Sequence, residues 1–179
     1  MRVLGLSGSL RRGSLNTALL RAAAGLAPEG MTIEIGCLSG LPLFDEDVEK
    51  SAYPKAARAL REHIRGSDAV LIATPEYNFS VPGVLKNALD WVSRPLADPV
   101  MAGKPVGIMG AGGRLGTARA QAHLRDICRA LGSVAVPMPE VFVVRAWEAF
   151  GPEGGLTDIG TQAAIRALLE AMMRLVPAS

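Results

Sequence analysis

Short apolar runs alternate along the chain with longer segments in which apolar residues recur at helical spacing. The short runs predict strands at residues 3–6, 32–37, 69–74, 105–109 and 134–144. The first, third and fourth are apolar almost throughout, which is typical of parallel strands covered on both faces. Apolar stripes predict helices over residues 15–26, 55–65, 85–92, 124–131 and 165–176. This alternation indicates an α/β protein with a mostly parallel sheet and right-handed crossovers.

The segment after the first strand has the composition of a phosphate-binding loop. In open α/β sheets ligands bind beyond the carboxyl ends of the strands, and residues 8–16 lie there and lead into a helix. The helix start supplies backbone N–H groups and partial positive charge. Ser9, Ser14 and Asn16 add neutral donors, and Arg11 adds a charged one. The alternative is that Ser14 is only a helix N-cap beside solvated arginines.

The same loop differs from loops that bind nucleoside triphosphates or dinucleotides. Ser14 directly follows Gly13, so the lysine of a P-loop is missing and nucleotide hydrolysis is not expected. Gly5, Gly8 and Gly13 also lack the GxGxxG spacing. A hydroxyl-rich loop of this kind suits one terminal phosphate monoester, such as that of FMN.

The segment after the third strand, residues 75–91, combines a rigid turn with an amphipathic helix. Pro75 fixes the exit from the strand, and Pro82 occupies a position that is favoured at a helix start. We expect the backbone N–H groups of residues 76–78 to face the edge of a flat heteroaromatic ring, with Tyr77 or Phe79 as an apolar wall. The alternative is an ordinary loop whose aromatic residues belong to the core.

A glycine-rich segment, residues 110–117, connects the fourth strand to the next predicted helix. Its GxGxxxG pattern is a weak variant of a dinucleotide-binding loop. Thr117 is expected to cap the helix that follows. His123 lies on one face of that helix with Arg119, and we expect a structural hydrogen bond from this histidine rather than general base catalysis.

Two of these strings together carry a family resemblance. The pattern Gly8-Ser9-x-Arg11-x-x-Ser14-x-Asn16 and the string PEYN…PGxLKNAxDW over residues 75–91 resemble the NADPH-dependent FMN reductase family, which includes quinone, chromate and azo-dye reductases. Matches over residues 41–47 and 110–125 extend the resemblance to most of the chain. It implies a flavodoxin-like three-layer sandwich, in which helices cover both faces of a five-stranded parallel sheet of order 2-1-3-4-5.

The resemblance also implies an activity and a set of site residues. Non-covalently bound FMN takes hydride from NADPH or NADH and passes it to a quinone, free flavin or another small acceptor, with chromate and azo compounds as further candidates. No catalytic side chain and no metal is expected, because the flavin N5 accepts the hydride. The turn at 75–78 then holds the isoalloxazine edge through backbone amides, and residues 110–113 approach its pyrimidine side. The expected cofactor-binding residues are Ser9, Arg11, Ser14, Leu15, Asn16, Pro75, Glu76, Tyr77, Asn78, Gly110, Ala111, Gly112 and Gly113.

Assembly into a homodimer or homotetramer is expected, because a single domain of this type leaves the outer face of the ring bare. Residues 81–91 and 41–44 are the candidate contact segments. The resemblance also implies that Arg119 pairs with Glu140 across a subunit interface; the alternative is a solvated helix charge. Ala122 departs from the family pattern, since some relatives carry an aromatic residue there.

Composition and charge exclude several classes of protein. With 49% hydrophobic and 20% charged residues, the 179-residue chain has material for a buried core and is not disordered. A net charge of +2 gives no strong field for nucleic acid. The longest apolar run is too short for a membrane span or a signal peptide. We therefore expect one cytoplasmic domain over residues 1–179.

Cysteine and histidine spacing gives no support for a disulfide scaffold or a zinc site. Cys37 and Cys128 form no CxxC motif, and the two histidines form no HExxH motif. The consecutive acidic residues 45–47 are expected to be a solvated loop rather than a metal site, since adjacent side chains diverge.

Two other classes of protein remain as alternatives. One is a flavodoxin-type electron carrier, which binds FMN without NAD(P)H oxidoreductase activity of its own. Such carriers are strongly acidic, whereas this chain has a net charge of +2. The other is a nucleotide-binding regulatory domain without flavin, which would be colourless.

Overall fold

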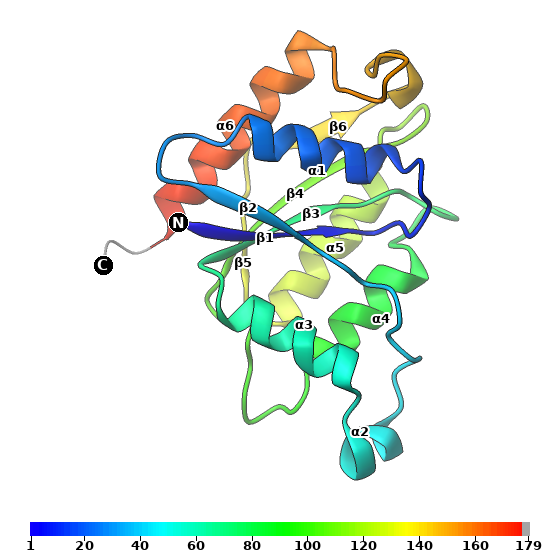
Figure 1. The fold of residues 1–179 in the computed structure, drawn as a ribbon, viewed down its shortest axis with the longest axis vertical. Coiled ribbons are helices and arrows are strands. Elements are labelled where there is room, and N and C mark those ends of the chain that lie inside the picture. Colours follow the sequence, from blue (N-terminus) through cyan, green and yellow to red (C-terminus); the bar gives the residue numbers. More distant parts are fainter. Residues whose placement is uncertain (177–179) are drawn as a thin grey trace.

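The computed structural model of the chain describes residues 1–176. Within these residues six strands form one sheet of order β2-β1-β3-β4-β5, with β6 beside β4 (Figure 1). Every strand pair is parallel, as predicted, and the order 2-1-3-4-5 is confirmed. The strands are β1 (Arg2–Ser7), β2 (Thr32–Gly36), β3 (Ala69–Ala73), β4 (Pro105–Ala111), β5 (Val134–Ala135) and β6 (Val141–Val143).

The predicted fifth strand, 134–144, is wrong as one continuous element. The structure divides it into β5 and β6, which pair with the first and last parts of β4. Pro137 and Pro139 lie in the interruption, and a proline has no N–H to give to a ladder.

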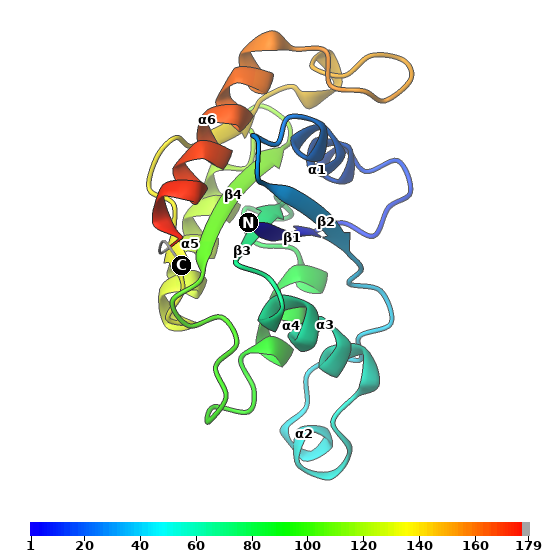
Figure 2. The same cartoon turned by 60° about the vertical axis from the view of Figure 1, so that its left-hand side comes forward.

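Helices cover both faces of the sheet (Figures 1 and 2). Helices α1 (Leu15–Gly25) and α6 (Ile159–Leu175) pack on one face around Leu19, Leu20 and Leu169. Helices α3 (Lys55–Arg65), α4 (Gly83–Val92) and α5 (Ala118–Ala130) pack on the other face. All five correspond to predicted helices, because each carries an apolar stripe toward the sheet.

Two short elements differ from the prediction. The acidic segment expected to be a loop begins helix α2 (Glu46–Ala52), which Asp45 caps by accepting a hydrogen bond from Asp47 N–H at 2.8 Å. The acidic first turn suits the positive end of the helix. A 3₁₀ turn, η1 (Ala146–Glu148), follows β6 in a region for which no element was predicted.

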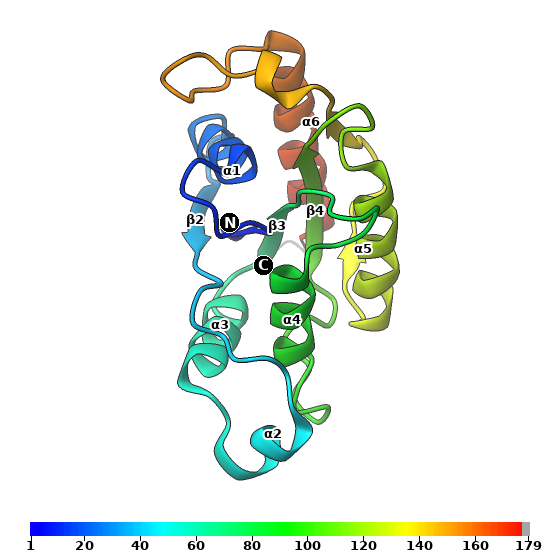
Figure 3. The same ribbon diagram turned by 90° about the vertical axis from the view of Figure 1, so that its right-hand side faces the viewer.

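The carboxyl ends of the parallel strands bring three loops to one edge of the sheet, which faces the viewer in Figure 3. These loops are residues 8–14 after β1, 74–82 after β3 and 112–117 after β4. They are the three segments in which the sequence predicts the site. No helix within residues 1–176 is long and apolar enough to cross a membrane.

Candidate functional site

The start of α1 is both a capped helix and an open donor site. Ser14 Oγ accepts a hydrogen bond from Thr17 N–H at 3.2 Å, so the N-cap interpretation is confirmed. The N–H groups of Leu15 and Asn16 have no acceptor within residues 1–176. The cap uses only one of the orphan donors of the first turn. Capping and anion binding are therefore compatible at this helix start.

The Asn16 side chain makes a structural contact that the sequence analysis did not identify. It is buried, its Nδ2 donates to Ala111 O at 2.9 Å, and its Oδ1 accepts from Ala111 N–H at 2.9 Å. These two bonds join the first turn of α1 to the last residue of β4. One Nδ2 hydrogen is thereby used, and the second Nδ2 hydrogen and the main-chain N–H of Asn16 remain as donors. The role of Asn16 in binding a phosphate stays a prediction.

Hydroxyl groups beneath the phosphate loop form a short network that the sequence analysis did not identify. Thr17 Oγ1 donates to Ser7 Oγ at 2.8 Å, and Ser7 Oγ also accepts from Ser9 N–H at 3.3 Å. Ser9 Oγ accepts from Arg11 N–H at 3.4 Å. Arg11 itself is exposed, and residues 8–16 contain no carboxylate. The loop therefore presents positive charge and neutral donors without a competing acid.

A tight turn follows β3. Tyr77 and Ser80 exchange main-chain hydrogen bonds of 3.1 and 3.0 Å around Asn78 and Phe79. These two central residues have φ of 49° and 62°, the left-handed region that glycine normally occupies and phenylalanine rarely adopts. Backbone strain of this kind persists where surrounding contacts hold it.

This turn changes which amides remain available to a ligand. The N–H of Tyr77 is used inside the turn, whereas those of Glu76 and Asn78 have no acceptor within residues 1–176. The prediction named all three amides, so two of them remain candidates for the edge of a ring.

The Glu76 side chain fixes the turn to helix α5. Its Oε2 accepts hydrogen bonds from the N–H groups of Arg119 at 2.9 Å and Ala120 at 3.0 Å. The carboxylate therefore caps α5 and opposes its dipole. Thr117, the predicted cap, makes no side-chain capping bond; its Oγ1 instead accepts from Gln121 Nε2 at 3.0 Å. The capping group comes from 43 residues earlier in the chain.

The glycines after β4 are required mainly by internal packing. A Cβ on Gly110 would lie 2.0 Å from Thr117 Oγ1 and 2.5 Å from Thr74 O. One on Gly112 would lie 2.5 Å from Gly116 O, and the Gly112 N–H already donates to Val143 O at 3.0 Å. Gly110 and Gly112 thus have a packing requirement of their own, and the approach of residues 110–113 to a ring stays a prediction.

Gly113 differs from the other glycines of this loop because the space around it is open. It is exposed, a Cβ built on it would meet no atom within 4 Å, and its N–H has no acceptor within residues 1–176. Its carbonyl accepts from Arg145 N–H at 2.9 Å, which fixes the peptide in place. Gly113 is thus the residue of the 110–113 segment best placed to donate to a ligand.

A cavity of about 480 Å³ lies between the turn after β3 and the loop after β4. Arg119 Cζ lies 4.1 Å from the centroid of the Phe79 ring, and that ring is 60% exposed. Aromatic and guanidinium groups at its wall make the cavity suitable for a planar ligand with polar edges. Its lining residues are Glu76, Phe79, Gly113, Arg114, Leu115, Gly116, Thr117 and Arg119.

Within the chain, Arg119 and Glu140 do not pair. Arg125 Nε lies 3.6 Å from Glu140 Oε1, so Glu140 has a partner in its own subunit. His123 Nδ1 lies 3.0 Å from Ser80 Oγ, so the expected structural hydrogen bond of this histidine is present. The Arg119 and His123 side chains thus both contact the turn after β3.

Two residues of the PGxLKNAxDW string hold a neighbouring loop. Asn87 Oδ1 accepts from Phe44 N–H at 2.8 Å, and Asn87 Nδ2 and Trp91 Nε1 both donate to Pro42 O at 2.8 Å. The Trp91 ring also meets Phe44 edge-on, with centroids 5.0 Å apart. These contacts explain why this string needs an amide and an indole, which the sequence analysis left without a role.

The part of the chain that the structure describes holds no group of three or more His, Cys, Asp or Glu side chains arranged to bind a metal ion. Cys37 and Cys128 are free thiols, the first exposed and the second buried. Burial raises the pKa of the Cys128 thiol, consistent with its position in the core.

Comparisons with known proteins agree with this geometry. Residues 1–148 match the family described as NADPH-dependent FMN reductase. The chain is 50% identical to an NAD(P)H-dependent FMN reductase of Pseudomonas aeruginosa, over 96% of this chain and 93% of that one. It is 42% identical to a 2-hydroxy-1,4-benzoquinone reductase of a Burkholderia species, over 91% and 89% of the two chains. The solved structure of FerB, a flavoenzyme NAD(P)H:(acceptor) oxidoreductase from Paracoccus denitrificans, superimposes with a TM-score of 0.88 at 35% identity, over 98% of this chain and 96% of that one.

Proposed function

The chain belongs to the NADPH-dependent FMN reductase family and is an NAD(P)H-dependent oxidoreductase that uses FMN; we propose that the edge described above holds this cofactor without a covalent bond. The observation that carries the assignment is the convergence of three loops. The first loop follows β1 and contains no carboxylate. The strained turn follows β3, and the exposed peptide of Gly113 follows β4, so all three lie at the carboxyl ends of these strands.

The donor set of the first loop fits a phosphate monoester. Ser9 and Arg11 supply side-chain donors, and Leu15 and Asn16 supply the N–H groups of the helix start. Ser14 keeps that helix start in place through its cap. Positive charge and aligned dipoles stabilise a dianion without a lysine or a metal ion.

The second and third loops fit the edge of an isoalloxazine ring. Pro75 fixes the path of the chain. The N–H groups of Glu76, Asn78 and Gly113 have no acceptor within residues 1–176, and other contacts hold the main chain around them. Tyr77, which is 53% exposed, supplies apolar surface beside them. Gly110, Ala111 and Gly112 act by packing and by positioning Gly113 rather than through donors of their own.

Bound FMN supplies the centre that accepts hydride. The protein therefore needs to bind and orient the cofactor and to exclude water, and none of its side chains needs to exchange a proton. The acceptor we propose is a quinone, free flavin or another small molecule, with chromate and azo compounds as further candidates. Relatives named as reductases share 40–50% identity with this chain, and they do not favour the electron-carrier alternative.

We also propose that the active form is a homodimer or homotetramer. The cavity beside the ring site opens outward, and Leu43 on the loop held by Asn87 and Trp91 is 83% exposed. A second copy of the chain would cover both features. The proposed domain is the full chain, 1–179, and the proposed location is the cytoplasm, where NAD(P)H is supplied.

A visible spectrum of the purified protein, before and after anaerobic addition of NADPH, tests this function. We expect flavin absorbance that bleaches on reduction and returns when a quinone is added. Light scattering on the same sample measures the assembly. A protein that stays colourless after incubation with FMN, or one whose flavin NADPH and NADH both fail to reduce, would contradict the proposal.

A further inference from the structure

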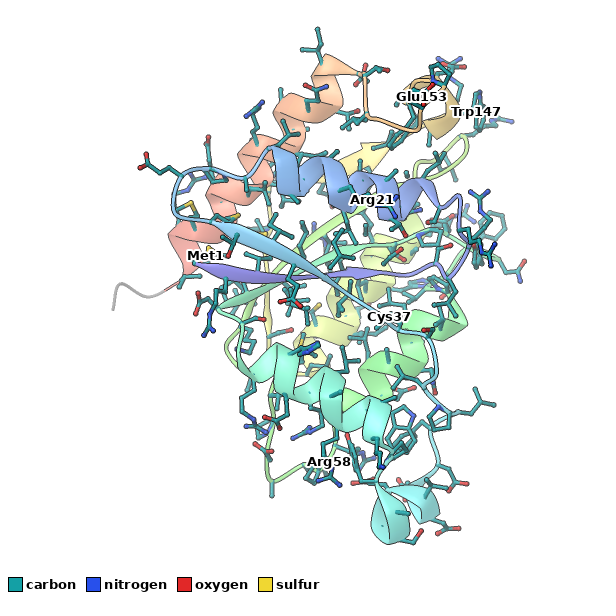
Figure 4. All side chains as sticks on the ribbon, in the orientation of Figure 1. Met1, Arg21, Cys37, Arg58, Trp147 and Glu153 are labelled. Atoms are coloured by element: carbon teal, nitrogen blue, oxygen red, sulfur yellow. The ribbon has the colours of Figure 1, made fainter. Side chains whose placement is uncertain are left out.

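A second cleft, of about 380 Å³, lies on the other side of the phosphate loop, between that loop and the end of β2. Arg21 comes from α1 and Cys37 from the chain just beyond β2 (Figure 4). Arg11 and Arg12 come from the phosphate loop, and Ser9 and Ser39 add hydroxyl groups.

The cleft has a strong and unbalanced charge. Three arginines line it, and no aspartate or glutamate does. Arg11, Arg12 and Arg21 make no ion pair within residues 1–176. Guanidinium groups gathered in one hollow repel each other, and an anion placed among them removes that repulsion. The cleft is therefore built for a ligand with concentrated negative charge.

The phosphate of FMN would neutralise only part of the positive charge in this cleft. The donors assigned to it are Arg11, Ser9 and the first N–H groups of α1, whereas neither Leu15 nor Asn16 lines the cleft. Arg12 and Arg21 are left for a second anion. Leu10, which is 57% exposed, also lines the cleft and adds an apolar surface of the kind that a nucleoside covers.

We propose that this cleft binds the 2′-phosphate of NADPH, and that Arg12 and Arg21 are the residues that select NADPH over NADH. The proposal rests on the proposed function, since it names the co-substrate of that same site. A phosphate monoester between two guanidinium groups gains charge-assisted hydrogen bonds that a ribose hydroxyl does not match.

Position and composition both agree with this assignment. Neighbouring strands lie about 4.8 Å apart, so a cleft over β1 and β2 is on the order of 10–15 Å from the loops after β3 and β4. The riboses and pyrophosphate of a dinucleotide bridge such a distance while the nicotinamide reaches the ring site. Dinucleotide folds that prefer NADH place an acid near the ribose 2′-hydroxyl. Here Gly36, Cys37 and Ser39 stand at the end of β2, and none of them carries a carboxylate.

Steady-state kinetics of the FMN-loaded enzyme test the two arginines. Arg12→Ala and Arg21→Ala should each lower kcat/KM for NADPH by roughly 10-fold, through KM, and leave kcat/KM for NADH within about twofold. Arg129→Ala is the matched control, because this exposed arginine lies at the far end of α5. Equal losses with both co-substrates, or no loss with either, would overturn the proposal. A fall in FMN content would do the same, because the cleft would then serve the cofactor phosphate.

A binding measurement separates the 2′-phosphate from the rest of the nucleotide. Calorimetry on the FMN-loaded protein should show 2′,5′-ADP binding at least 10-fold more tightly than 5′-AMP, which lacks only the 2′-phosphate. Arg12→Ala and Arg21→Ala should remove that difference. Equal affinities for the two nucleotides would contradict the assignment.

Cys37 gives an independent readout of the same cleft. Hydrogen bonds from the Ser39 side chain and main chain lower the pKa of the Cys37 thiol, which favours its reaction with iodoacetamide. Bound 2′,5′-ADP should slow alkylation of Cys37 several-fold, and 5′-AMP should not; Cys37→Ser identifies the signal, because Cys128 is buried. Absence of protection would overturn the proposal. If wild-type enzyme still binds FMN and oxidises NAD(P)H, the proposed function stands although this inference fails.

Discussion

The phosphate loop and the turn after β3 present main-chain N–H groups by two different physical means. The phosphate loop, residues 8–14, uses the ordinary start of a helix, where Ser14 supplies a local cap and no residue of the loop has a left-handed φ. The turn after β3 uses two left-handed residues, Asn78 and Phe79, and a carboxylate that caps a helix 43 residues further along. One donor set is local and unstrained, whereas the other depends on tertiary contacts.

This difference predicts that binding and turnover are separable. Damage to the phosphate loop removes charge and donors but leaves its helix in place. A change in the turn after β3 displaces main-chain N–H donors. The strained main chain and the Glu76 side chain hold these donors in position. The first change should weaken FMN binding, and the second should lower the rate of enzyme that still holds FMN.

The largest expected effect comes from inserting one glycine between Asn78 and Phe79. The insertion breaks the hydrogen-bonded pair of Tyr77 and Ser80 and displaces the N–H groups beside the ring. A misplacement of about 1 Å can lower a rate about 100-fold, so we expect that loss in NADPH oxidation with a quinone acceptor. FMN content, measured by absorbance, should persist. One glycine inserted between Gly154 and Gly155, in an exposed loop, is the control; an active 78–79 insertion would show that this turn does not position the ring.

Arg11→Ala should raise the dissociation constant for FMN by roughly 10-fold or more, because a charge-assisted hydrogen bond contributes about 1.5–3 kcal/mol. Within residues 1–176 the Arg11 side chain makes no hydrogen bond or ion pair, so the melting temperature of the apoprotein should not change. Ser14→Ala should also weaken FMN binding, but it should destabilise the protein by about 1 kcal/mol through loss of the cap. Fluorescence titration and thermal unfolding measure the two quantities; unchanged FMN affinity in both variants contradicts the phosphate assignment.

Glu76→Ala should lower the free energy of unfolding by about 1–2 kcal/mol, because two N–H groups at the start of α5 lose their acceptor. For a protein of this size that corresponds to a decrease of about 2–8 °C in Tm. Glu76→Gln keeps an oxygen acceptor and should lose less. Thermal unfolding of the two variants gives the comparison, and equal losses would show that the carboxylate charge, rather than the accepted hydrogen bonds, stabilises the helix.

The smallest effect is expected for Tyr77→Phe, which keeps the ring wall and the main chain and should lower turnover only several-fold. NADPH oxidation and FMN content are again measured together. If this variant were almost inactive while fully loaded with FMN, the tyrosine hydroxyl would take part in the chemistry. The cofactor would then not carry the reaction alone.

The strands and helices were predictable because their apolar patterns are local, whereas the sheet order 2-1-3-4-5 followed from the family resemblance. The fully apolar run at 69–73 predicts a central strand, and the parallel crossovers follow from the helices between strands. The break in the fifth strand also has a local signal, Pro137 and Pro139, which the apolar pattern of 134–144 obscured. Helix α2 was missed because its acidic first turn resembles a solvated loop until Asp45 is seen to cap it.

The site was predicted at the level of its loops but not of its side chains. The sequence places Asn16 and Glu76 beside the cofactor and cannot show that each already bonds to main chain far away. Hydrogen bonds between residues 43 or 95 positions apart leave no periodic pattern in a single sequence. The same holds for Asn87 and Trp91, whose partner Pro42 O is defined only by the folded loop.

The two hydrogen bonds between Asn16 and Ala111 join parts of the chain that are synthesised at different times. The first turn of α1 emerges from the ribosome early, but the residue that secures it lies 95 positions later, at the end of β4. These two hydrogen bonds close a loop of 95 residues, and a loop of that length carries a cost in chain entropy. The contact that holds the first turn of α1 against β4 can therefore form only on a chain that has been made beyond Ala111.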